Sequence, residues 1–117
     1  MRSLLCALAL VSIATSARAD EPLCAWAKRS VAELDSRHGS HVSRTLVRDA
    51  GAADAAASMN AARTELSRCF AGWTIRDRRG HAALGDAKEL AVESKTRGIY
   101  LTARGVPDAF TVEVVVR

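Results

Sequence analysis

The sequence predicts a single small α+β domain with about three helices, a C-terminal β-hairpin and one disulfide bond. Three observations predict it: apolar residues recur with a helical period in three stretches, two short runs of β-prone residues lie near the C-terminus, and two cysteines stand on the apolar stripes of two of the helices. Neither an internal repeat nor a domain-scale change of composition occurs along the 117 residues, so one domain is expected.

The first 19 residues have the pattern of a secretory signal peptide. Arg2 gives the positive start, an apolar run extends from Leu4 to Ile13, and Ala17-Arg18-Ala19 is a small-x-small cleavage site. The run is shorter than the about 20 apolar residues of a transmembrane anchor. A buried N-terminal helix of a cytosolic protein is the alternative. We expect a bacterial periplasmic or secreted protein without a transmembrane anchor, whose mature domain comprises residues 20–117.

Two helices are expected at Glu21 to Arg37 and at Ala53 to Phe70. Pro22 is tolerated in the first turn of the first helix, and Gly39 can end it. The apolar stripe of the first helix consists of Leu23, Cys24, Ala27, Val31 and Leu34. The stripe of the second consists of Ala55, Met59, Ala62, Leu66, Cys69 and Phe70.

The segments around these helices are less regular. His41 to Val47 fits either a short helix or an irregular link. Trp73 and Ile75 alternate with polar neighbours, which indicates a short extended piece that dips inward. A third helix is expected at His81 to Glu93, where one stripe consists of Ala83, Leu84, Ala87, Leu90 and Ala91.

The hairpin is expected from Ile99 to Thr102 and from Phe110 to Val116, because glycine, proline and aspartate lie between these runs. In the second run Phe110, Val112, Val114 and Val116 share one apolar face that must pack on the helices. A two-stranded hairpin leaves both strands with an unpaired edge. Either the helices cover that edge, or it pairs with a partner or a second copy of the chain, so a homo-oligomer is one expected form.

Cys24 and Cys69 are the two cysteines of the mature chain, and an even count in an exported protein predicts a disulfide. They stand near the start of the first helix and the end of the second, which suits antiparallel helices. In the chain-entropy model, the disulfide that closes this loop stabilises the folded state by about 4 kcal/mol. A catalytic or redox cysteine is the alternative, but the Cys-x-x-Cys spacing is missing.

Catalytic, metal and cofactor residues are not predicted. His38, His41 and His81 lack a carboxylate or cysteine at zinc-ligand spacing, and the serines near them lack the Gly-x-Ser-x-Gly elbow of a nucleophile. Removing the leader takes away Arg2 and Arg18, which lowers the formal charge from +4 to +2. Export and this near balance argue against a nucleic-acid partner.

One resemblance follows from the order of motifs. Cys24 opens a helix, Cys69-Phe70-Ala71-Gly72 closes another, and Thr74-Ile75-Arg76 and Ala82-Ala83-Leu84-Gly85 come after. This layout resembles small exported alphaproteobacterial proteins with two cysteines that have no assigned function. It covers about half of the mature chain and not the hairpin, and it implies a compartment and no activity.

The function expected from these features is that of a non-enzymatic protein acting by protein–protein or cell-envelope contact, with an inhibitor or immunity protein as one form. The candidate contact residues are Arg76, Arg78, Arg79, Phe110, Val112 and Val114. The alternative is a small periplasmic hydrolase or redox enzyme whose site combines His38, His41 and His81 with scattered acids. A pocket where two of these histidines meet an acid would distinguish the two.

Overall fold

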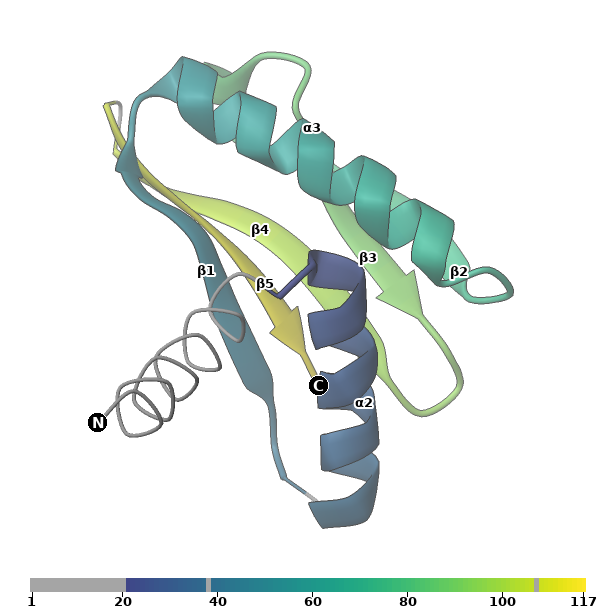
Figure 1. Cartoon of the computed structure of the whole chain (residues 1–117). Coiled ribbons are helices and arrows are strands. Elements are labelled where there is room, and N and C mark those ends of the chain that lie inside the picture. The colour runs from purple at the N-terminus through teal and green to yellow at the C-terminus, as the bar shows by residue number, and fades with distance from the viewer. Residues whose placement is uncertain (1–20, 38, 107) are drawn as a thin grey trace, which may run out of the picture.

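The structure, a computed structural model, describes residues 21–37, 39–106 and 108–117. The predicted leader lies outside these residues. They form two α-helices, a 3₁₀ turn and five strands (Figure 1). In chain order these are α2 (Leu23–Arg37), β1 (Val42–Ala50), α3 (Ala52–Cys69), β2 (Thr74–Arg78), η1 (Ala82–Leu84), β3 (Glu89–Glu93), β4 (Gly98–Val106) and β5 (Ala109–Val116).

The five strands form one antiparallel sheet in the order β1-β5-β4-β3-β2. β2 to β5 follow one another as a meander, and α3 carries the chain from β1 at one edge to β2 at the other (Figure 1). The last strand, β5, therefore pairs with both β1 and β4. The two edges of the sheet are β1 and β2.

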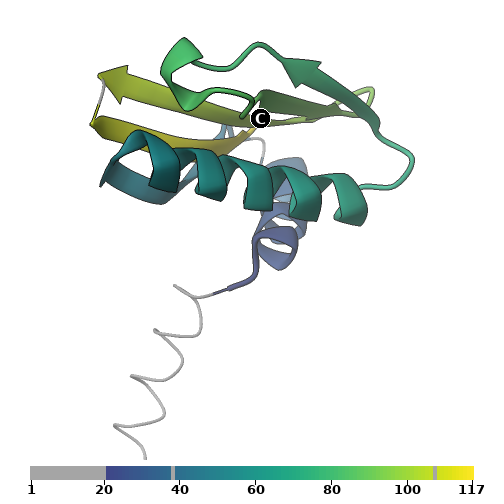
Figure 2. The ribbon, with the colours of Figure 1, turned by 90° about the horizontal axis from the view of Figure 1, so that it is seen from above.

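Both helices pack on one face of the sheet, below it in the view of Figure 2. The apolar face predicted for β5 is the centre of this core, and its four residues are 0% exposed. The predicted stripe of α3 meets it through Ala55, Met59, Ala62 and Leu66. We call the opposite side of the sheet, turned away from the helices, the outer face.

The prediction of three helices with a C-terminal hairpin is wrong, because the third helix is not formed. The segment from His81 to Glu93 contains only the turn η1 and the strand β3. Gly85 has φ 62° and ends η1, so no helix continues through it. Leu90 and Val92 then point into the core from a strand paired on both sides. In so short an alanine-rich run, the spacing of apolar residues fits a helix as well as a strand.

The segment from His41 to Val47 was expected to be a short helix or an irregular link, but from Val42 onward it belongs to β1. Two register shifts, between Thr45 and Val47 and between Val47 and Ala50, break the alternation of its side chains. Leu46 and Val47 both pack against the core as a result. The short extended piece predicted around Ile75 is confirmed as β2.

The predicted hairpin is confirmed as the β4–β5 pair, but it does not stand alone. β1 covers the free side of β5, and β3 covers that of β4. Among the described residues, strands of the same sheet therefore cover the hairpin edges, and not the helices or a partner as the two alternatives from the sequence had it.

Candidate functional site

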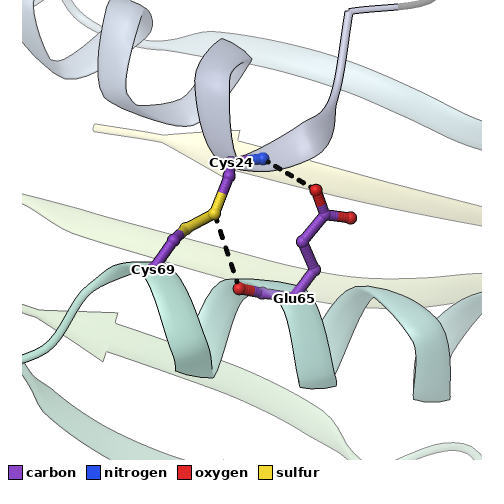
Figure 3. Close-up of a disulfide and its surroundings, with 3 residues drawn as sticks. All are labelled: Cys24, Glu65 and Cys69. Carbon is purple, nitrogen blue, oxygen red and sulfur yellow. Dashed lines mark hydrogen bonds between the residues drawn. A yellow bond between two sulfur atoms is a disulfide. The ribbon is translucent and has the colours of Figure 1, made fainter.

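The predicted disulfide between Cys24 and Cys69 is confirmed. The two Cα atoms are 5.9 Å apart across a sequence separation of 45, and the bond joins the first turn of α2 to the last residue of α3 (Figure 3). Glu65, one turn earlier in α3, accepts a hydrogen bond from the backbone N–H of Cys24 at 3.2 Å. A carboxylate at a helix N-terminus satisfies a free N–H and interacts favourably with the helix dipole. The bond and the carboxylate thus fix the same pair of helix ends.

The sulfur of Cys24 also lies 3.7 Å from the backbone carbonyl oxygen of Glu65 (Figure 3). A disulfide sulfur carries no proton, so this is a packing contact in the oxidised protein. The surroundings of the disulfide are therefore those of a structural bond between two helices.

The two histidines that the structure describes do not converge. His81 accepts a hydrogen bond from the backbone N–H of Ala83 at 3.1 Å and packs its ring on Phe110, with ring centroids 5.0 Å apart. His41 precedes β1 at the other end of β5, where Val42 pairs with Val116. Six residues of strand separate these ends, which is about 20 Å.

A histidine-based hydrolase site therefore does not form from His41 and His81. His38 lies outside the described residues. Within the described ranges, no group of three or more histidine, cysteine, aspartate or glutamate residues could hold a metal ion.

Three of the predicted contact residues lie in the interior. Phe110, Val112 and Val114 are 0% exposed, point toward the helices and belong to a strand that is paired on both sides. Their use as a contact surface is corrected on this ground, since a partner could reach them only by displacing β1 or the helices. The sequence predicted that the helices cover this face, but it did not show that β1 pairs with the remaining edge of the strand.

The other three predicted contact residues lie at the free edge of the sheet. Arg76 and Arg78 belong to β2, and Arg79 follows directly. All five residues of β2 are exposed. One side of the strand pairs with β3, from Thr74 opposite Glu93 to Arg78 opposite Glu89. Its other side has no backbone partner among the residues that the structure describes.

Pairing fixes where the β2 side chains point, because residues opposite one another in a sheet share a face. Arg76 lies opposite Ala91, which is outside the core cluster, so Thr74, Arg76 and Arg78 project from the outer face. Ile75 lies opposite the core residue Val92 but is still 42% exposed, because it stands at the margin of the helix layer. It does not dip inward as predicted.

Two ion pairs hold β2 to the rest of the molecule. On the helix side Arg63 of α3 reaches Asp77 at 2.7 Å, and its hydrogen bond lowers the pKa of that carboxyl. On the outer face the Arg76 side chain donates to Glu93, and the Tyr100 hydroxyl donates to the same carboxyl at 2.9 Å. The Arg76 hydrogen bond, followed by that of Tyr100, lowers the pKa of Glu93.

Arg78 and Arg79 differ from Arg76 in having no ion-pair partner within the described ranges. They line an open groove of about 580 Å³ at the end of β2, together with Lys88 and the acids Asp77 and Asp86. Asp77 is already neutralised by Arg63. The groove therefore keeps an excess of positive charge.

Gly80 permits the shape of this groove. A Cβ atom at this position would lie 2.2 Å from the backbone oxygen of Ala87, so any side chain there would push apart the two ends of the connection between β2 and β3. Ile75 and Lys88 are the site residues that the sequence did not single out for contact. The sequence shows Ile75 only as an apolar residue among exposed arginines and Lys88 only as a lysine after a turn. Neither pattern indicates a contact residue until β2 is known to be an edge strand.

We call β2, Arg79 and the adjoining groove the β2 edge site. In the described part of the chain, no helix is long and apolar enough to cross a membrane. The resemblance to small exported alphaproteobacterial proteins stays a prediction. Comparison of the chain with protein-family models, curated proteins and solved structures gave no match.

Proposed function

We propose that this chain is an exported, non-enzymatic protein that binds another protein through the β2 edge site. The observation that carries the proposal is that the β2 edge site combines a free backbone edge with an exposed apolar side chain, Ile75, and two arginines, Arg78 and Arg79, that form no ion pair among the described residues. Free edges of this kind pair with extended segments of other chains. An inhibitor or immunity protein is one form that such a binding protein can take.

Export is supported by the signal-peptide pattern and by the Cys24–Cys69 bond, because disulfides persist in oxidising compartments. The intact mass of the protein recovered from the periplasm or medium is expected to correspond to a chain that begins at Asp20. Recovery of the uncleaved chain from the cytoplasm would contradict export.

The competing explanation is that the charges of β2 only protect its edge from aggregation, as short charged edge strands often do. Ile75 argues against it, since protection would place a polar side chain at this exposed position. Ile75 and Val106 are the two large apolar side chains that the described residues expose, at 42% and 64%. Val106 lies beside the β4–β5 turn rather than on an open edge, so it provides a matched control.

Site-specific photo-crosslinking in the exporting bacterium tests the proposal. A photoreactive phenylalanine analogue at Ile75 is expected to give a discrete adduct with a second protein, whereas the same analogue at Val106 gives none. The double charge reversal Arg78→Glu with Arg79→Glu should remove the adduct, and the reversal of two exposed cations elsewhere, Lys28→Glu with Arg48→Glu, should keep it. No adduct from Ile75, or equal adducts from both positions, would refute the β2 edge site.

A further inference from the structure

The charges of β2 weigh against a second copy of this chain as its occupant. The two-fold antiparallel register that pairs all five residues with those of a second copy places Arg76 opposite Arg76. It also brings both Arg78 side chains, which form no ion pair among the described residues, to the same outer face. Like charges directly opposite one another destabilise a strand pair. An occupant that brings negative charge to this face avoids this repulsion.

We propose that the occupant is an extended acidic segment of another protein, which adds to β2 as a sixth strand. This inference rests on the proposed function and names the chemistry of the partner. The backbone of the segment would bond to the free side of β2, and its carboxylates would face Arg76 and Arg78 on the outer face. Antiparallel addition continues the pattern of the sheet and is slightly more stable per residue than parallel addition.

The alternation of β2 specifies the sequence of the segment. Residues opposite Arg78 and Arg76 lie two apart and share the outer face, so both are acidic. The residue opposite Asp77 is free to vary, because Arg63 already pairs with that carboxylate. The residue opposite Ile75 is apolar, because it would lie beside this exposed apolar side chain at the margin of the core. Read in its own direction, the segment is acid–any–acid–apolar.

The two arginines are not equivalent in this complex. Arg76 is bonded to Glu93, so a carboxylate of the partner would share it, whereas Arg78 lies opposite Glu89 and near Glu93 but forms no ion pair with either among the described residues. Arg78 therefore contributes more to affinity than Arg76 does. An exposed site of this kind also binds more weakly as ionic strength rises.

Two synthetic peptides of one composition test the inference on the full oxidised domain. Acetyl-Thr-Glu-Thr-Glu-Val-Thr-amide has the required alternation. Acetyl-Thr-Thr-Glu-Glu-Val-Thr-amide keeps the valine opposite Ile75 but places its glutamates on adjacent residues, so only one of them can reach the outer face and the other turns toward Asp77. We expect the first peptide to bind about tenfold more tightly, the loss expected for one misplaced charge-assisted contact.

Backbone amide NMR locates the bound peptide. The first peptide is expected to shift the amides of residues 74–78 and to slow the hydrogen exchange of alternate residues among them. Arg78→Glu should abolish these effects, whereas Arg48→Glu, an exposed arginine on the other edge strand, should leave them unchanged.

Each result decides between the alternatives. Equal binding of both peptides would overturn strand addition in favour of unspecific charge attraction, and the absence of binding by either would overturn the acidic partner. If the domain self-associates and Arg76→Glu abolishes that self-association, the acidic partner is overturned in favour of a second copy of the chain. If the peptides fail while the Ile75 crosslink persists, only the partner chemistry is discarded. If the crosslink is also absent, the proposed function is discarded with it.

Discussion

β2 and β5 belong to the same sheet and have opposite surroundings. β5 is paired on both sides, and every second side chain is buried under the helices. β2 is paired on one side, and all of its residues are exposed. A strand rich in valine is stabilised most where neighbours cover both its edges and one face, whereas arginine and aspartate tolerate an edge. The comparison teaches that β5 holds the domain together, whereas β2 is an edge strand with a free side, to which we propose that another molecule binds.

The largest expected effect on stability comes from truncating one side chain in each of the two strands. Phe110→Ala should lower the free energy of unfolding by about 3–5 kcal/mol, because it empties a fully buried position. Ile75→Ala should lower it by less than about 1 kcal/mol. Urea unfolding of both variants measures the difference. Similar losses in the two variants would mean that β2 is as much a part of the core as β5.

Proline substitutions distinguish β5 from β2 by the backbone hydrogen bonds that each strand makes. Val115 lies opposite both Tyr100 and Ser43, so its N–H bonds into the sheet on one side or the other, and Val115→Pro should destabilise the domain by about 3 kcal/mol or more. In an edge strand every second N–H points outward. Of Ile75→Pro and Arg76→Pro, one should therefore remain folded by circular dichroism. Unfolding of both would show that β2 has no free side.

The helix cover that distinguishes β5 from β2 depends in part on the disulfide. Replacing both Cys24 and Cys69 by alanine should lower the free energy of unfolding by about 2–4 kcal/mol, because the unfolded chain is no longer constrained. The binding of the acidic peptide at β2 should persist below the melting temperature, since the edge lies outside this cover. Denaturant titration measures the free energy of unfolding, and NMR measures the binding of the peptide. Loss of peptide binding in the folded variant would show that binding at β2 depends on the disulfide.

The smallest effect concerns the ion pairs that hold β2 in place. Arg63 lowers the pKa of Asp77, and Arg76 with Tyr100 lowers that of Glu93, so both carboxyls favour the folded state when ionised. Their contribution is fully present above the ordinary pKa values of 3.8 and 4.5 and is lost as the pH falls through the lowered values of the folded protein. NMR titration should show the resonances of β2 changing at acid pH before those of β5. Arg76→Ala should reduce this dependence, and simultaneous changes in both strands would contradict it.

The sequence predicted α2, α3, the hairpin strands and the disulfide, because each has a strong local signal, but its third helix was wrong. The stripe of α3 and the alternation of β5 are long and regular, and the cysteines stand at the ends of regular elements. β1 and β3 lacked such a signal. Register shifts break the alternation of β1, and the leucine, alanine and valine of β3 fit a helical stripe. Arg76, Arg78 and Arg79 could be selected as exposed cations, but not as members of an edge site.

The sequence by itself thus determined which residues must be covered: the faces of α2, α3 and β5, with the cysteines that join the helices. Only the tertiary structure decided what covers them. β1 and β5 are separated by about half of the chain, and their pairing comes from the crossing of α3 over the sheet rather than from any local pattern. That pairing closes the edge of β5 and leaves β2 at the margin. Edges are a property of the whole sheet, because a strand is free only when no other segment, however distant in sequence, reaches it.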